Sequence, residues 1–140
     1  MTADSGRAGT LRPVPGEEAT IKVLIADDDP IVRAVLEGLV GRADDLVLVG
    51  AAGSASEAAS LAEEHQPHVA VLDWVMPDGG GPRAADDISS VSPETKIIAL
   101  TASDSEYAAM DMLRAGAINV LVKDSSMSAI ADAIRSASRD

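Results

Sequence analysis

The chain has 140 residues, a size typical of one domain, and 46% of them are hydrophobic. Its formal net charge is −12, which argues against direct binding to nucleic acid or to an anionic membrane, because both need a basic patch. No cysteine is present for disulfide or thiol chemistry, and no apolar run is long enough for a membrane span, so we expect a cytoplasmic protein.

Residues 1–20 contain three glycines and two prolines without hydrophobic periodicity, which predicts a flexible N-terminal tail. The remainder, residues 21–140, is expected to form one domain. It starts with an apolar run at Ile21–Ala26. Asp29 and Pro30 then have the character of a helix N-cap and a first helical residue. The spacing predicts that one face of this helix carries Ile31, Ala34, Val35, Gly38 and Leu39.

The next predicted elements follow the same rhythm. A second apolar run, Leu46–Ala51, is followed by Ser54–Glu57, which matches a capping box at the start of a second helix. A third run, His68–Leu72, leads into Asp78–Pro82, which we interpret as the turn into a third helix.

The C-terminal part repeats the pattern twice. The run Lys96–Leu100 is followed by a second capping box, Ser103–Glu106, and Gly116 is expected to end that helix. The last run is Ile118–Val122. The final helix carries apolar residues at core spacing, namely Met127, Ile130, Ala131, Ile134 and Ala137.

The five apolar runs are rich in β-branched residues and apolar on both faces, as buried parallel strands are. Their alternation with helical segments predicts an α/β fold, with a doubly wound parallel sheet covered by helices on both faces.

Polar side chains gather where the predicted strands end. Ligands of open α/β sheets bind at the carboxyl ends of the strands, so these residues are the candidates for a site. Asp27, Asp28 and Asp29 follow the first strand, Asp73 the third, Thr101 the fourth and Lys123 the fifth. Taken singly, each could be a turn residue, a helix cap or a solvated lysine. Four strand ends carrying such groups together favour a functional site.

The residue types at these ends suit phosphoryl chemistry. Converging carboxylates repel one another unless a cation relieves the repulsion, and oxygen ligands favour Mg²⁺ or Ca²⁺. Lys123 could then neutralise one phosphoryl oxygen and the Thr101 hydroxyl could donate to another. In that arrangement Asp73 could attack phosphorus and form an acyl phosphate.

At these residues the chain resembles the receiver domain of two-component response regulators. The resemblance rests on Asp27-Asp28, on LDWVMPDGGG from Leu72 to Gly81, on Thr101-Ala102 and on Lys123-Asp124, and it extends from Ile21 to the C-terminus. It implies a flavodoxin-like (βα)5 fold with strand order 2-1-3-4-5.

The resemblance also implies roles for individual residues. Asp73 would be the phosphoacceptor, Asp28 a direct Mg²⁺ ligand, Asp27 a ligand acting mainly through water, and the backbone carbonyl of Val75 a further ligand. Thr101 and Lys123 would be the switch hydroxyl and the phosphate-pairing lysine. The chain departs from many members at Val120, where they carry an aromatic switch residue, and at Asp124, where they carry proline.

We therefore expect a phosphoacceptor switch that takes its phosphoryl group from a sensor histidine kinase or a phosphotransfer protein. Phosphorylation would change the conformation near Thr101 and the face of the fourth and fifth helices, and the phosphoryl group would then be lost to water. The switch would not turn over a separate substrate, a second copy of the chain is a candidate partner, and the downstream effector is undefined by the sequence. One alternative is a pseudo-receiver that only binds proteins. Another is an aspartyl-phosphate phosphohydrolase, which would need a second aspartate where Val75 stands.

Overall fold

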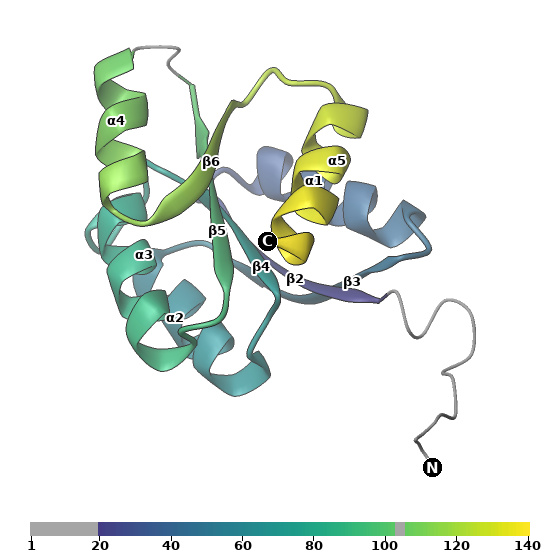
Figure 1. Cartoon of the computed structure of the whole chain (residues 1–140), viewed down its shortest axis with the longest axis horizontal. Helices are drawn as coiled ribbons and strands as arrows, with labels where there is room; N and C mark the ends of the chain where they lie inside the picture. Colours follow the sequence, from purple (N-terminus) through teal and green to yellow (C-terminus); the bar gives the residue numbers. More distant parts are fainter. Residues whose placement is uncertain (1–19, 103–105) are drawn as a thin grey trace.

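A computed structural model describes residues 20–102 and 106–140, which form a three-layer α/β structure (Figure 1). The predicted tail, apart from Thr20, lies outside the described residues, as do Ser103, Asp104 and Ser105 of the second capping box. None of the helices in the described ranges combines the length and hydrophobicity that a membrane span requires.

The central layer is a sheet of five parallel strands in the spatial order β3-β2-β4-β5-β6. In chain order this is 2-1-3-4-5, so the predicted topology is confirmed. Each predicted apolar run became a strand, with ends that differ from the prediction by at most one residue. The strands are β2 (Ile21–Ala26), β3 (Leu46–Ala52), β4 (Val69–Asp73), β5 (Lys96–Thr101) and β6 (Ala117–Val122).

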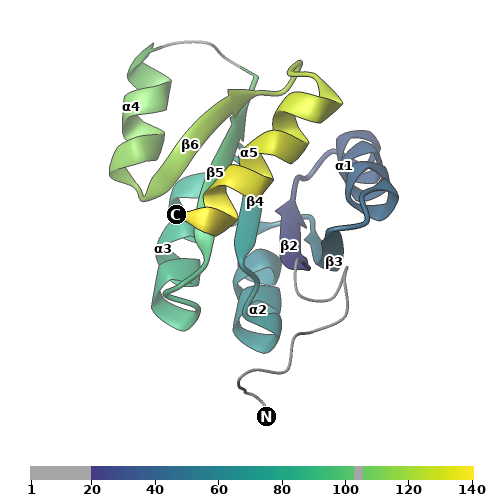
Figure 2. The same cartoon turned by 45° about the vertical axis from the view of Figure 1, so that its right-hand side comes forward.

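Helices cover both faces of this sheet. Helices α1 and α5 lie on one face, and α2, α3 and α4 lie on the other (Figures 1 and 2). Their bounds are α1 (Pro30–Arg42), α2 (Ala55–His65), α3 (Gly80–Val91), α4 (Glu106–Arg114) and α5 (Met127–Arg139). Because both faces are covered, every residue of the central strand β4 is buried, which explains why its sequence is apolar without alternation until Asp73.

Side chains at the starts of three helices satisfy free backbone N–H groups. Asp29 accepts from Ile31 N, Ser54 from Glu57 N and Ser126 from Ala129 N, and the first two confirm the predicted caps. The predicted capping box at Ser54 differs in one detail, because Glu57 Oε1 accepts from the backbone N–H of Gly53 rather than from that of Ser54.

The predicted apolar face of α1 overlaps its buried face only at Leu39, so the rest of the prediction is wrong by a rotation of the helix. Leu36, Leu39 and Val40 are its buried residues, whereas Ile31 is 73% exposed and Val35 is 42% exposed. Helix α1 is apolar around much of its circumference, so its periodicity is compatible with more than one face. Packing against the sheet and α5 selects the face that includes Leu36.

The loop between β4 and α3 needs glycine for two physical reasons. Three consecutive residues, Asp78, Gly79 and Gly80, have positive φ angles, a region that favours glycine. At Gly81, a β-carbon would overlap the indole ring of Trp74. Trp74 thus packs across the start of α3, directly beside Asp73, and the predicted turn at Asp78–Pro82 runs into α3 after Gly79.

Candidate functional site

The candidate residues meet at the carboxyl edge of the sheet. Asp73 is the last residue of β4 and Thr101 the last of β5, while Asp27 follows β2 and Lys123 follows β6. Strand register brings their ends together, because Ala26 pairs with Leu72 and Asp73 pairs with Leu100. The sequence prediction of one shared edge is therefore confirmed.

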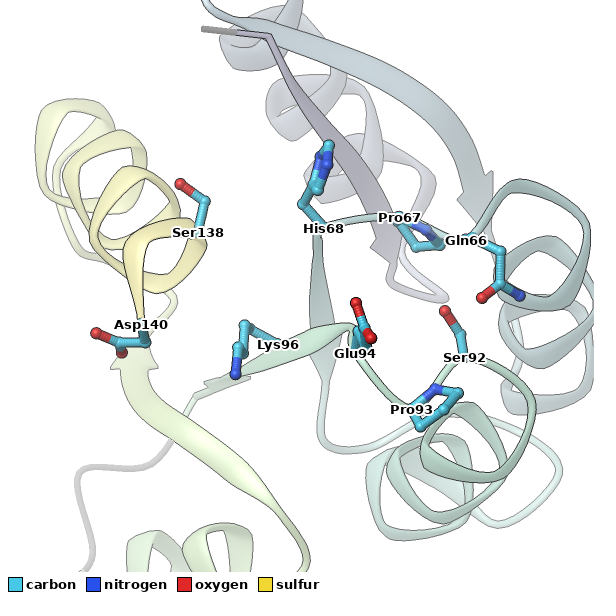
Figure 3. A pocket seen from close by; sticks show the side chains of 9 residues that line it. All are labelled: Gln66, Pro67, His68, Ser92, Pro93, Glu94, Lys96, Ser138 and Asp140. Atoms are coloured by element: carbon cyan, nitrogen blue, oxygen red, sulfur yellow. The ribbon is translucent and has the colours of Figure 1, made fainter. Parts of the chain in front are cut away.

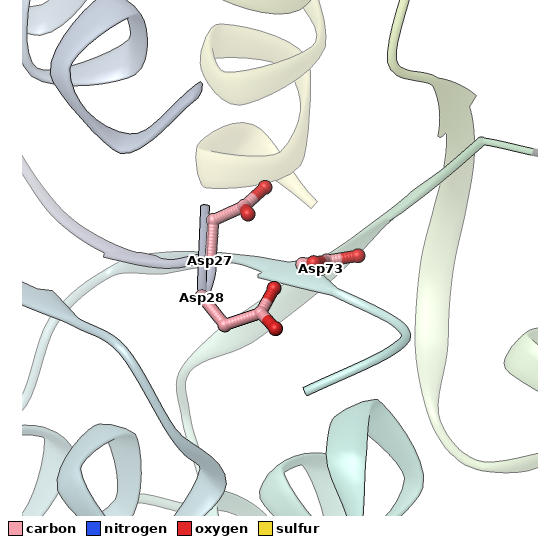
Figure 4. A group of neighbouring side chains, drawn as sticks. All are labelled: Asp27, Asp28 and Asp73. Carbon is pink, nitrogen blue, oxygen red and sulfur yellow. The ribbon is translucent and has the colours of Figure 1, made fainter. Parts of the chain in front are cut away.

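Three carboxylates form the centre of this edge. Asp27, Asp28 and Asp73 each present one oxygen, and these oxygens lie within 4.8 Å of one another (Figure 4). Asp27 is fully buried and Asp73 is 3% exposed, whereas Asp28 is exposed. The cluster thus combines two desolvated carboxylates with one that faces solvent.

Lys123 provides the positive charge of the site. Its Nζ lies 3.0 Å from Asp27 Oδ2 and 3.0 Å from Asp73 Oδ2. The backbone N–H of Lys123 donates to the carbonyl of Thr101 at 2.8 Å, which fixes the start of its side chain to the end of β5. One ammonium group thus bridges two of the three carboxylates and leaves a net negative charge for a further cation.

Backbone groups hold the other carboxylate oxygens. Asp29 N donates to Asp27 Oδ1 at 2.9 Å, and Val75 N donates to Asp73 Oδ1 at 3.2 Å. Asp27 Oδ2 is buried, and among the described residues its polar contact is the Lys123 ammonium at 3.0 Å, which it shares with Asp73. A buried carboxylate oxygen that shares a single ammonium group, next to two more carboxylates, fits a hard divalent cation such as Mg²⁺.

The ionisable groups of the site perturb one another. Burial raises the pKa of the Asp73 carboxyl, and the nearby Asp27 charge acts in the same direction, while Lys123 and the Val75 N–H oppose the rise. Burial would lower the pKa of Lys123, but its contacts with Asp73 and Asp27 outweigh that effect and raise it. Lys123 therefore stays charged and favours the ionised form of Asp73.

Thr101, Val75 and Val120 occupy different environments around this centre. Thr101 is 7% exposed, on the strand next to Asp73. Val75, two residues after Asp73, is 79% exposed, and its backbone N–H donates to the Asp73 carboxylate. Val120 on β6 packs partly against the core layer beneath α2, α3 and α4, and as a valine it offers no aromatic ring to rotate at that position.

The structure adds a residue that the sequence reasoning missed. Arg33 on α1 donates from Nη1 to the carbonyl oxygen of Asp27 at 2.8 Å. The sequence offered no signal for it, because an arginine one turn into a helix is ordinarily a solvated residue.

A cleft of about 610 Å³ lies at the opposite, amino edge of the sheet (Figure 3). It contains none of the predicted site residues. Side chains of mixed charge line it, including His68, Glu94, Lys96 and the terminal Asp140. The convergence of charged groups at the carboxyl edge, rather than cleft volume, makes that edge the candidate functional site.

Comparison with known protein families identifies the same segment. Residues 23–135 match the family described as response regulator receiver domain. The chain is 39% identical over 119 residues to the uncharacterized transcriptional regulatory protein YxjL of Bacillus subtilis, covering 85% of this chain and 55% of that protein. It is 39% identical over 104 residues to the DNA-binding transcriptional activator DevR/DosR of Mycobacterium tuberculosis, covering 74% and 48%. The chain thus spans about half the length of these curated relatives.

Solved structures agree with this match. A two-component response regulator of the LuxR family from Aurantimonas superposes with a TM-score of 0.80 at 28% identity, covering 86% of each chain. The response regulator domain of Thermotoga maritima CheB superposes with a TM-score of 0.79 at 26% identity, covering 86% of this chain and 98% of the other.

Proposed function

The chain belongs to the response regulator receiver domain family, and from that premise we propose that it is an Mg²⁺-dependent phosphoacceptor switch with Asp73 as the acceptor. The observation that carries this proposal is the placement of Asp73 at the end of the central strand, 3.0 Å from the Lys123 ammonium and within a cluster of carboxylates. Asp27, Asp28, Asp73 and the Val75 carbonyl are the groups we assign to Mg²⁺. Bound there, Mg²⁺ would neutralise phosphoryl oxygens that bare carboxylates would repel.

In the reaction we propose, an Asp73 carboxylate oxygen forms a bond to phosphorus while the bond from phosphorus to the donor's histidine nitrogen breaks. The imidazole leaves with the electron pair of that bond. Lys123, which already contacts Asp73, moves its charge to a phosphoryl oxygen, and the Thr101 hydroxyl donates to another. The acyl phosphate is later lost to water, and no separate substrate is turned over.

The partner that supplies the phosphoryl group would be a sensor histidine kinase or a phosphotransfer protein in the cytoplasm. For the output we propose the surface formed by α4 and the start of β6. This surface exposes Tyr107, Met110, Leu113 and Ile118, whose exposed fractions range from 42% to 83%. A second copy or an effector could cover it. The matched segment covers only about half of the relatives named as transcription regulators, so a DNA-binding effector outside this chain is the output we expect.

Intact-mass spectrometry after incubation with acetyl phosphate tests the proposal. We expect one phosphoryl adduct on the wild type, dependent on Mg²⁺, and none on Asp73→Asn. Asp78→Asn is the matched control, because Asp78 lies in the same loop but its carboxylate accepts from Ser56 Oγ, outside the cluster. It should be phosphorylated like the wild type.

The variant Lys123→Ala separates Mg²⁺ binding from the response to phosphorylation. We expect it to impair the phosphorylated-state response more than Mg²⁺ binding, since its charge pairs with the phosphoryl group. A well-folded wild type without any adduct would refute the acceptor role and leave a domain that acts by protein binding alone.

A further inference from the structure

Arg33 makes a contact to the acidic site that the proposed chemistry does not use. It lies in the first turn of α1, is half-buried, and donates from Nη1 to the Asp27 carbonyl oxygen at 2.8 Å. That carbonyl belongs to the peptide that joins Asp27 to Asp28. The contact therefore acts on the main chain between two of the three carboxylates.

Among the described residues, no side-chain contact holds the Asp28 carboxylate in place. Within residues 20–102 and 106–140, its carboxylate has no hydrogen-bond or ion-pair partner, and the residue is exposed. Its position follows from the backbone of the turn, which is held on either side by Asp27 N donating to Ala52 O at 3.0 Å and Asp29 N donating to Asp27 Oδ1 at 2.9 Å. Arg33 secures the peptide between these two contacts.

The end of β3 leaves room for this guanidinium group. A β-carbon at Gly53, the residue after β3, would lie 3.1 Å from Arg33 Nη1, closer than ordinary van der Waals contact. Arg33 thus lies between α1 and the end of β3, in a defined place rather than in open solvent.

We propose that Arg33 is a positioning residue for the cation site: by binding the Asp27 carbonyl, it fixes the Asp27–Asp28 peptide so that both carboxylates face the metal. The inference rests on the proposed function, because it takes Asp27 and Asp28 as Mg²⁺ ligands. Hydrogen-bond partners of metal ligands orient them in this way in many sites.

A purely electrostatic role would have the opposite sign. Arg33 carries a positive charge close to the cluster, so removal of that charge alone would strengthen the binding of a divalent cation. Removal of a positioning contact weakens Mg²⁺ binding. Without the contact Asp28 is freer before the cation binds, so binding must then restrict it at a cost in conformational entropy. The direction of the change in Mg²⁺ affinity therefore distinguishes the two roles.

The experiment is an Mg²⁺ titration followed by the fluorescence of Trp74, the one tryptophan of the chain and the neighbour of Asp73. Four proteins are compared: wild type, Arg33→Met, Arg33→Lys and Arg42→Met. Arg33→Met keeps the aliphatic stem but removes the donor and the charge, and Arg33→Lys keeps the charge and a donor. Arg42→Met is the matched control, an exposed arginine in the last turn of the same helix. Urea unfolding without Mg²⁺ is measured in parallel.

For Arg33→Met we expect the Mg²⁺ dissociation constant to rise about tenfold, the lower end of the usual effect of such partners. Arg33→Lys should lie between it and the wild type, and Arg42→Met should equal the wild type. Unchanged or tighter binding by Arg33→Met, or a lysine variant no better than it, would overturn the inference. A loss of stability without Mg²⁺ at unchanged Mg²⁺ affinity would also overturn it. If Arg33→Met does not fold, Arg33→Lys decides, with measurably weaker binding expected.

The acetyl phosphate assay on the wild type keeps the two proposals apart. A wild type that binds Mg²⁺ but takes up no phosphoryl group would refute the acceptor role, while the titrations still decide the role of Arg33. A wild type that binds no Mg²⁺ would overturn both.

Discussion

Replacement of Asp28 by asparagine should stabilise the protein without Mg²⁺ and remove most of its stabilisation by Mg²⁺. Asparagine has nearly the shape of aspartate but carries no charge. Asp28 is the exposed member of the cluster, so the substitution leaves no buried group unpaired. The substitution should raise stability without Mg²⁺ and lower the stabilisation that Mg²⁺ adds. Stability measured with and without Mg²⁺ therefore tests the reasoning better than either measurement alone.

The magnitude follows from the distances. At 4.8 Å, two unit charges repel by about 0.9 kcal/mol in water and by about 3.5 kcal/mol at an effective dielectric constant of about 20. Since Asp28 is exposed, the lower figure applies to its repulsion from Asp27 and from Asp73, and the Lys123 charge offsets part of it. We expect the free energy of unfolding without Mg²⁺ to rise by about 1 kcal/mol. Mg²⁺ at ten times its dissociation constant should stabilise the wild type by about 1.4 kcal/mol, and Asp28→Asn much less.

The assay is urea unfolding monitored by Trp74 fluorescence, in EDTA and in excess Mg²⁺. Asp29→Asn is the control, because it removes the same charge one residue away and asparagine retains the helix-capping side chain. It should change stability by less than about 0.5 kcal/mol. A variant Asp28→Asn that is less stable than the wild type in EDTA, or equally stabilised by Mg²⁺, would refute the view that charge repulsion and a shared cation govern this cluster.

Three further predictions concern the scaffold. The pKa of Asp45 is lowered, mainly by the hydrogen bonds that its carboxylate accepts from Arg135 at 2.7 and 3.1 Å. The pair therefore stabilises the folded state at pH values above the ordinary aspartate pKa of about 4. This stabilisation is lost as the pH falls through the lower pKa of the folded state. Asp45→Asn should therefore cost roughly 0.5–1 kcal/mol in urea unfolding at pH 7, discounted for solvent screening, and nothing in strong acid; a constant cost across pH would contradict this. Gly81→Ala should destabilise by about 1–3 kcal/mol and shift Trp74 emission, because its methyl group overlaps the indole; an unchanged spectrum would count against that packing. Gln66 has a φ of 49°, a region that favours glycine, and its Nε2 donates to three carbonyls at the ends of α2 and α3. Gln66→Ala should therefore lower the free energy of unfolding by about 1–2 kcal/mol, and Gln66→Gly should lower it less. A larger loss for Gln66→Gly than for Gln66→Ala would exclude backbone strain as a factor.

The candidate site was largely predictable because it depends on strand ends. A carboxylate that follows a buried apolar run must emerge at the edge of the sheet where that run stops, as Asp73 does after Val69–Leu72. Lys123 was predicted at this edge, but its contact with Asp27 as well as Asp73 was not. That bridge depends on the spatial order of the strands, which sequence spacing does not encode.

The sequence by itself determined the strands, the class of fold and the members of the acidic cluster, because runs of β-branched residues and polar strand ends are local signals. Tertiary structure alone decided which face of α1 is buried, since Ile31, Leu36 and Leu39 are all apolar and only packing against the sheet and α5 distinguishes them. It alone also decided that Arg33 binds the Asp27 carbonyl, because this contact needs α1 docked beside the glycine that follows β3. Local patterns specify what each segment can form. The docking of the segments specifies which of their polar groups meet.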